Sequence, residues 1–190
     1  NQKSPLTIVS ETPPPPGPLS GKIQAQNWPV SVAACEIVLG PSLDPKKWKE
    51  AQTKAAATAF IPGRRMKTRM YGREIWIDGA HNLPAIESLL NDLPVSDPTF
   101  VIGILKTKAG ADMIQRVSQS SSKIRYCEFS PEAFSLPQIQ ALNPKIRPFL
   151  MGEKLEDNGP FLVTGSLMFV SKFIQCYQLD FELGQPQYVN

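Results

Sequence analysis

The alternation of short apolar runs with helical patterns between residues 74 and 177 most constrains what this chain can fold into. Runs such as 99–105 (TFVIGIL) are apolar along their length, and they alternate with segments such as 83–93 that have apolar residues at helical spacing. Strands that are buried on both faces have continuous apolar sequences, and strand–helix alternation is typical of parallel sheets. The sequence therefore predicts an α/β fold, with a Rossmann-like, mostly parallel sheet and helices on both faces.

Two helices are expected before this region. Residues 29–39 predict a mostly buried helix with Pro29 in its first turn and Gly40 at its end. Residues 46–59 predict an Ala-rich helix, with Ser42 and Asp44 as capping candidates. In the α/β region we expect strands at 74–78, 99–105, 124–129, 147–151 and 161–164, and helices at 83–93, 111–117, 136–142 and 166–177.

The first 20 residues are rich in proline, with four in succession at 13–16. Proline has no N–H group, so such a segment forms neither a helix nor a paired strand interior. An extended connector is expected, and an SH3-type ligand is the alternative.

Charge and cysteine content exclude several classes of protein. Lys+Arg 20 against Asp+Glu 17 gives a net charge of +3, which is too mild for a nucleic-acid-binding surface. No apolar stretch approaches the roughly 18 residues that span a bilayer, and the N-terminus has no signal-peptide pattern. Cys35, Cys127 and Cys176 have apolar neighbours and predict buried free thiols. We expect a cytoplasmic protein without nucleic-acid or membrane partners.

His81 is the one histidine in the chain, which excludes a metal site that needs two or three imidazoles. It falls in the segment 78–82 (DGAHN), directly after an expected strand. Open parallel sheets bind ligands at the carboxyl ends of their strands, so this segment is a candidate site together with 105–110 and 164–166. The alternative is structural, because Asp78, Asn82 and Ser166 are all good helix-capping types.

A basic segment, 64–73, contains five Lys or Arg residues and no acid. Most of it is expected to be a solvated loop or an edge strand. Arg64 differs because Pro62-Gly63 places it in a turn just before the α/β region. A guanidinium held in that way suits phosphate or ribose oxygens.

Two enzyme classes are disfavoured. The pattern G-x-x-x-x-G-K-[ST] is absent, so the chain has no triphosphate cradle of its own. Ser166, His81 and Asp78 could suggest a Ser-His-Asp hydrolase, but G-x-S-x-G is absent. In addition, Asp78 and His81 lie in one tight loop, which is awkward for orienting the imidazole.

Pro62-Gly63-Arg64, followed by Asp78-Gly79-Ala80-His81-Asn82 and then Gly165-Ser166, resembles the C-terminal half of folylpolyglutamate synthases. Bacterial members are often also dihydrofolate synthases, and the Mur ligases are relatives. Gly21, Gln24 and Asn27 are similar to the end of the family's central ATPase domain, so the resemblance covers about residues 21–178. The chain departs from the family pattern at Ile23 (usually His), at Leu83 (commonly Pro) and at 107–109, where Thr-Lys-Ala replaces a sequence close to Asp-Lys-Asp.

The resemblance implies a division of the chain into residues 1–60, a proline-rich segment with helices from the end of the ATPase domain, and residues 61–190, the C-terminal glutamate-ligase domain. It also implies an ATP-dependent amide ligase that adds glutamate to dihydropteroate or folate through an acyl phosphate. ATP and Mg²⁺ would be bound mainly by the N-terminal ATPase domain, which this chain lacks, so the chain alone would be inactive.

The resemblance assigns roles to six residues. The expected catalytic residues are His81, beside the transferred phosphoryl group, and Asp78. Arg64 and Asp78 would also reach the nucleotide. The three residues expected to bind substrate are Asn82, Lys108 and Ser166, the last of them through a glutamate carboxylate. Two alternatives stay open. A Mur-type ligase would add another amino acid to a nucleotide-linked precursor, although Asp-Gly-Ala in place of Asp-Tyr-Ala favours folate; a non-catalytic module would bind a partner.

Overall fold

The computed structural model describes residues 6–15, 23–40, 43–59, 61 and 63–179. The chain divides into two compact units between Ile61 and Pro62. The predicted boundary between residues 60 and 61 stays a prediction, because a division into compact units does not identify the origin of either part.

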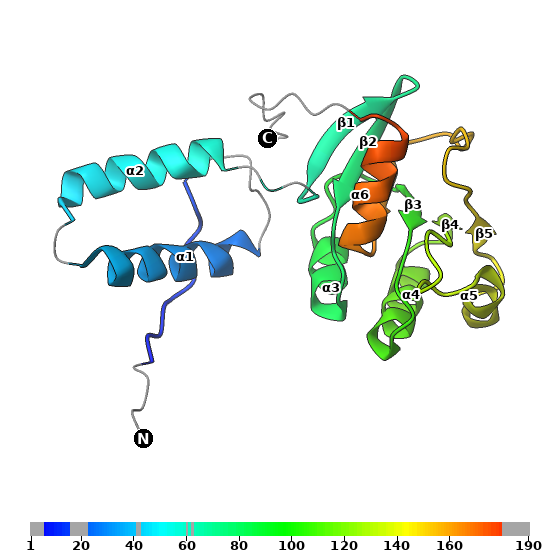
Figure 1. Ribbon diagram of the computed structural model, residues 1–190, viewed down its shortest axis with the longest axis horizontal. Helices are drawn as coiled ribbons and strands as arrows, with labels where there is room; N and C mark the ends of the chain where they lie inside the picture. Colours follow the sequence, from blue (N-terminus) through cyan, green and yellow to red (C-terminus); the bar gives the residue numbers. More distant parts are fainter. Residues whose placement is uncertain (1–5, 16–22, 41–42, 60, 62, 180–190) are drawn as a thin grey trace. The chain divides into compact units, whose positions relative to one another are not determined.

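The described residues of the first unit form two helices, α1 (Gln24–Leu39) and α2 (Pro45–Thr58) (Figure 1). Asp44 caps α2 as expected, since its carboxylate accepts a hydrogen bond of 2.9 Å from the Lys47 amide. The Trp48 indole donates to the Glu36 carboxylate at 2.8 Å, which joins the two helices.

Two expectations for α1 are wrong. None of its described residues is buried, and Pro29 lies inside the helix because α1 begins at Gln24. Apolar residues occupy every side of α1, so a single neighbouring helix cannot cover them. Val38, for example, is 82% exposed.

The second unit is an α/β layer structure (Figure 1). Its six strands lie in the order β1-β2-β6-β3-β4-β5, with β1 antiparallel to β2 and the other pairs parallel. The strands are β1 (Met66–Met70), β2 (Arg73–Asp78), β3 (Thr99–Ile102), β4 (Ile124–Tyr126), β5 (Arg147–Pro148) and β6 (Phe161–Thr164). The helices are α3 (Leu83–Asn91), α4 (Lys108–Ser120), α5 (Leu136–Leu142) and α6 (Leu167–Cys176).

Both faces of the sheet are buried under helices. Side chains alternate along each strand, so Ile75, Ile77 and Val163 pack with Phe169 and Phe173 of α6. Residues of the opposite face pack against α3, α4 and α5, and they include Trp76, Phe100 and Leu162 with Ile86, Ile114 and Ile139. The predicted fold class, a mostly parallel sheet with helices on both faces, is confirmed.

Several predicted bounds were wrong by a few residues. The strand expected at 99–105 ends at Ile102, because the Gly103 amide donates to Thr164 O at 3.2 Å and the chain then leaves the ladder. The helix expected at 111–117 begins at Lys108, because the Thr107 hydroxyl accepts from the Gly110 amide and caps it. The strands expected at 124–129 and 147–151 likewise end three residues early, at Tyr126 and Pro148, and the other bounds of the α/β unit differ by at most two residues.

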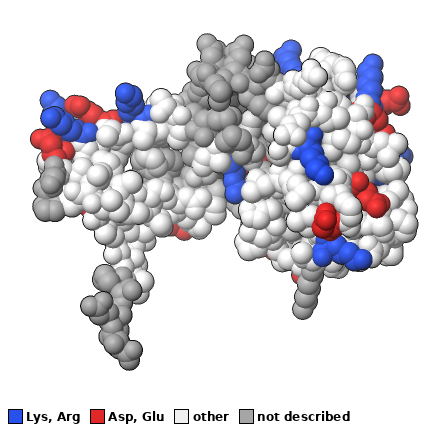
Figure 2. Space-filling model, in the orientation of Figure 1, with Lys and Arg blue, Asp and Glu red and all other residues white. Residues whose placement is uncertain are grey.

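The cysteine prediction is wrong for two of three thiols. All three are free, but only Cys127 is buried. Cys35 lies on α1, which buries nothing, and Cys176 is the last residue of α6, where the helix leaves the core. No helix among the described residues is long and apolar enough to cross a membrane. On the face drawn in Figure 2, described basic and acidic side chains are interspersed over the surface.

Candidate functional site

Three neighbouring strands end together at the carboxyl edge of the sheet. Asp78, the last residue of β2, is the register partner of Thr164 at the end of β6. Thr164 in turn pairs with Ile102 at the end of β3. The segments that follow, 79–82, 165–166 and 103–107, therefore start side by side, at the edge where open α/β sheets bind ligands.

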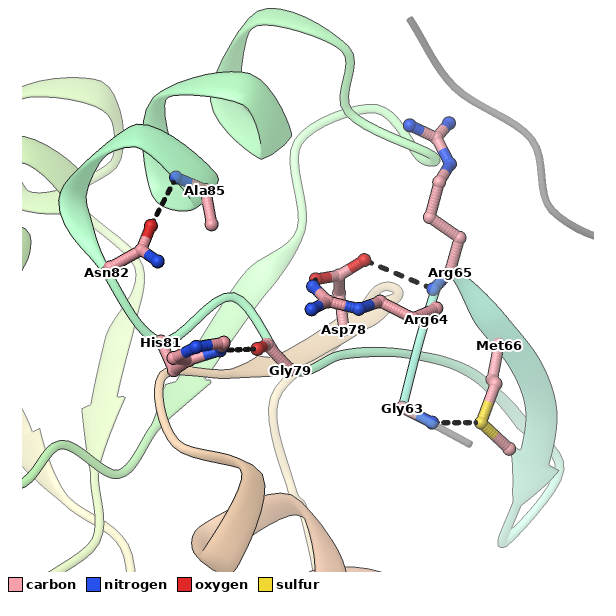
Figure 3. A network of polar contacts seen from close by, with 9 residues as sticks. All are labelled: Gly63, Arg64, Arg65, Met66, Asp78, Gly79, His81, Asn82 and Ala85. Carbon is pink, nitrogen blue, oxygen red and sulfur yellow. Dashed lines mark hydrogen bonds and ion pairs between the residues drawn. The ribbon is translucent and has the colours of Figure 1, made fainter. Parts of the chain in front are cut away.

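Asp78 is the buried carboxylate of this edge. Its side chain is 10% exposed, Oδ2 accepts from the Arg65 amide at 3.1 Å, and Oδ1 lies 4.0 Å from Nη1 of Arg64 (Figure 3). Burial raises the pKa of the Asp78 carboxyl above its ordinary value, although the Arg65 amide and the charges of Arg64 and Arg65 act in the opposite direction. The result is a buried acceptor of hydrogen bonds that lies between the Arg65 amide and the Arg64 guanidinium.

Arg64 is held by its backbone neighbours, while its guanidinium stays available. The Gly79 amide donates to Gly63 O, and the Gly63 amide contacts Sδ of Met66 at 2.7 Å, so the turn before Arg64 is tied to the loop after β2. The Arg64 side chain is 35% exposed and points to Asp78 and toward the side of His81 (Figure 3). A guanidinium has five N–H donors, and a single ion pair at 4.0 Å leaves most of them for a ligand.

His81 is exposed in the loop between β2 and α3. Its Nδ1 lies 2.9 Å from Gly79 O (Figure 3). A carbonyl oxygen only accepts, so this contact requires a proton on Nδ1. Nε2 is then an acceptor in the neutral ring and a donor only in the imidazolium form.

Asn82 is the N-cap of α3, as the structural alternative predicted. Its side-chain oxygen accepts from the Ala85 amide at 2.9 Å (Figure 3). A substrate contact by Asn82 would therefore fall to its NH₂ group. Asp78, in contrast, caps no helix and is held by the Arg65 amide instead.

Ser166 is the N-cap of α6, but its hydroxyl makes no capping hydrogen bond. The residue is 6% exposed, and the first amides of a helix have no partner within the helix. Gly165 before it has φ 119°, and a Cβ there would lie 2.6 Å from Gly103 O, so only glycine fits this approach. Thr164 Oγ1 is buried without a hydrogen-bond partner among the described residues. Hydroxyl and amide donors at a helix N-terminus suit a carboxylate or phosphate.

Lys108 is the first residue of α4, so its backbone follows β3 at the same edge. The position of its side chain lies outside the described part of the structure, and its substrate role stays a prediction.

Sequence reasoning missed two contributors to the edge. Arg65 supplies the amide that holds Asp78, and Leu167 of α6 packs so closely on the loop that a Cβ on Gly79 would lie 2.3 Å from its Cδ2. The glycine of the DGAHN segment is the signal for the second contact. No local pattern indicates the first.

The described residues suit a nucleotide better than a metal ion. Among them, no group of three or more His, Cys, Asp and Glu side chains could hold a metal. The Asp78 carboxylate also lies beside the Arg64 guanidinium, which repels a cation but complements phosphate and ribose oxygens.

Fold and edge together define a Rossmann-like α/β domain with an arginine–aspartate pair, a histidine and a helix N-terminus at one sheet edge. The fold matches folylpolyglutamate synthases. The Mycobacterium tuberculosis enzyme, solved with ADP and AMPPCP, matches with TM-score 0.69 and 18% identity over 86% of this chain and 42% of its own. The Thermotoga maritima enzyme matches with TM-score 0.61 and 22% identity over 84% of this chain and 39% of its own.

A bifunctional folylpolyglutamate synthase/dihydrofolate synthase from Yersinia pestis matches with TM-score 0.65 and 20% identity over 87% of this chain and 42% of its own. The chain thus spans about two fifths of the length of these proteins. No family model and no curated protein matches the sequence. The resemblance inferred from the motifs is confirmed at the level of the fold.

Proposed function

We propose that this chain is the C-terminal part of an ATP-dependent ligase that adds glutamate to dihydropteroate or to a reduced folate. The main support for this proposal is one arrangement of residues in a fold shared with folylpolyglutamate synthases. At one edge of the sheet lie Arg64, Asp78, His81 and Ser166. Two of the matched structures hold ADP, which supports a nucleotide as the ligand of the arginine–aspartate pair.

The proposed chemistry forms an amide from a carboxylate and an amine. A carboxylate is a poor electrophile, so the reaction first converts it to an acyl phosphate at the expense of ATP, and phosphate then leaves as the glutamate amine attacks. The amine must be unprotonated and close to the acyl carbon, so that positioning supplies much of the rate. Water must be excluded, because it would hydrolyse the acyl phosphate.

The chain's own residues divide these tasks. Arg64 donates to phosphate or ribose oxygens, and Asp78 accepts from a ribose hydroxyl while Arg65 holds its other oxygen. His81 donates from Nε2 to developing negative charge when its ring is protonated. Ser166 and the α6 N-terminus bind a glutamate carboxylate, with Lys108 as a further cation for the same anion.

The proposed partner of this chain is an N-terminal ATPase domain, which would carry the phosphate loop and bind Mg²⁺. The absence of a phosphate loop from the sequence and the partial coverage of the matched structures support this. So does α1, whose exposed apolar residues include Val30, Ile37 and Val38. A helix that is apolar on all sides is typically buried, and the rest of an ATPase domain would bury it. On this proposal the chain alone is inactive.

The test joins this chain to its ATPase domain and measures incorporation of radiolabelled glutamate into dihydropteroate and into tetrahydrofolate. Incorporation into either confirms the ligase. Incorporation of another amino acid into a nucleotide-linked precursor would indicate a Mur-type ligase, and no turnover with any of them would leave a non-catalytic module. Ser166→Ala should raise the glutamate KM, and Asn82→Ala should chiefly lower stability through the lost cap, by about 1 kcal/mol.

A further inference from the structure

We propose that Arg65 and Asp92 form a clamp that positions Asp78 and Arg64 for the nucleotide, so that Arg65 is a positioning residue of the site. The inference rests on the proposed function for the identity of the ligand. The clamp itself rests on the backbone conformation of Arg65, which directly precedes β1, and on its contacts with the end of β2 and the C-cap of α3.

The backbone of Arg65 has a conformation that side chains rarely adopt. Its φ is 46°, in the left-handed region that favours glycine. Such residues persist only where their surroundings hold them, and they gather at functional sites. Here the conformation aims the Arg65 amide at Oδ2 of Asp78, at 3.1 Å.

The contacts of the Arg65 side chain stabilise this backbone conformation. The side chain points away from Asp78, and Nη1 donates to Asp92 O at 2.8 Å and to Asp92 Oδ2 at 2.9 Å (Figure 3 shows its direction). Only 18% of the Arg65 side chain is exposed, so this ion pair is shielded from water and is stronger than a typical surface pair. The amide and the guanidinium of one residue therefore grip two different carboxylates.

The second carboxylate belongs to the far end of α3. Asp92 is the C-cap of that helix, and the last turn of α3 contains no basic residue. A cation near a helix C-terminus is stabilising, and Arg65 provides one from another element. The β2–loop–α3 segment is consequently fastened at Asp78, before the loop, and at Asp92, after the helix.

Arg64 lies between two residues whose backbones are hydrogen-bonded to β2 and to the loop after it. The residue before it, Gly63, accepts from the Gly79 amide, and the residue after it donates to Asp78. With both neighbours tied to the loop, the backbone of Arg64 is held beside Asp78, and Nη1 lies 4.0 Å from Asp78 Oδ1. Loss of the clamp should therefore disturb two nucleotide contacts together.

The first experiment tests the clamp by a measurement that does not depend on enzymatic activity. Hydrogen exchange of the backbone amide at position 65 is measured by NMR in this chain, for the wild type and for Arg65→Met, Asp92→Asn and Arg65→Lys. Loss of a hydrogen bond of ordinary strength corresponds to about fivefold faster exchange, which we expect for Arg65→Met. Arg65→Lys should restore most of the protection, because one nitrogen makes both contacts in the wild type.

Arg69→Met is the matched control. Arg69 is an exposed arginine of β1, the strand that follows Arg65, so this variant removes the same charge and leaves the clamp intact. Unchanged exchange in Arg65→Met and Asp92→Asn would overturn the proposal. So would equal acceleration in Arg69→Met, because the effect would then come from net charge.

The second experiment uses the ligase joined to its ATPase domain. Arg65→Met should raise the ATP KM by about fivefold or more with a smaller change in the glutamate KM, and Arg65→Lys should restore it. An equal rise in both constants, or a loss of stability without a change in KM, would mean that Arg65 is merely structural. If the wild type shows no turnover, the proposed function fails while the exchange result still decides whether the clamp exists.

Discussion

The two-helix unit and the α/β unit differ in how far their apolar residues are buried. In α1 no described residue is buried, although the helix is rich in Val, Ile and Ala, whereas β2, β3 and β6 are buried almost throughout. In α2 only Ala56 is buried. Two helices provide one contact surface, while a sheet provides two that helices can cover. Apolar content by itself therefore does not indicate a core, because a core also needs elements that face one another.

The largest expected effect comes from separating the two regions. A fragment of residues 63–179 should retain cooperative thermal unfolding, since both buried clusters lie within it. A fragment of residues 23–59 should lose most of its helix content, since isolated helices of this length are marginal in water. Circular dichroism of both fragments measures this. A stable two-helix fragment that unfolds cooperatively would contradict this difference between the two units.

Two glycines of the α/β unit compare tight packing at the carboxyl edge with open space elsewhere. Gly165 and Gly159 have φ of 119° and 117°, but a Cβ at Gly165 would lie 2.6 Å from Gly103 O, whereas nothing lies within 4 Å at Gly159. Gly159→Ala should cost about 1–3 kcal/mol of unfolding free energy from backbone strain, and Gly165→Ala about 1–3 kcal/mol more from overlap.

Chemical denaturation of both glycine variants gives the two free energies. Because the two φ values are nearly equal, backbone strain cancels when the two losses of unfolding free energy are subtracted. Equal losses would show that the carboxyl edge is less tightly packed than its contacts indicate.

Thiol labelling compares the regions residue by residue. Burial raises the pKa of the Cys127 thiol to about 11, and the thiolate is the reactive form. Cys35 in the first unit and Cys176 in the second are exposed. Iodoacetamide followed by peptide mass spectrometry should therefore label these two in the native protein and reach Cys127 only on unfolding. Rapid labelling of Cys127 would show that the α/β core opens readily.

The smallest expected effect concerns Asp78. Burial raises its native pKa, so between the ordinary value of 3.8 and the raised value the native state binds more protons than the unfolded chain. The ionised carboxyl therefore costs stability, which falls as pH rises through that window. Asp78→Asn should lack this loss and should melt slightly higher than the wild type at pH 7. Melting curves from pH 3 to pH 8 measure the difference, and a lower melting temperature at neutral pH would contradict it.

The sequence was sufficient for the features that depend on local pattern. Continuous apolar runs identified β2, β3 and β6, and the capping side chains marked the starts of α2 and α3. The chemistry of the edge was also foreseeable in part, since parallel strands must end together and DGAHN follows one of them.

Other features depend on pairing between distant residues. Met66–Met70 is a strand because it pairs with β2, and its basic composition allowed a loop equally well. The Arg65 contact with Asp92 joins residues 27 positions apart, and it requires a backbone conformation that no residue type at position 65 indicates. The exposure of α1 was misjudged because an apolar helix implies a covering surface without showing that the chain contains one.

The place of β6 has a consequence for how the protein is made. β6 is the last strand among residues 63–179, yet it lies between β2 and β3 and pairs with both. Until residues 161–164 have left the ribosome, the inner edges of β2 and β3 have no partner and remain open to pairing with other chains. The two halves of the carboxyl edge join only when β6 inserts between them. A nascent chain interrupted shortly before that point would thus present an aggregation-prone sheet whose carboxyl edge is incomplete.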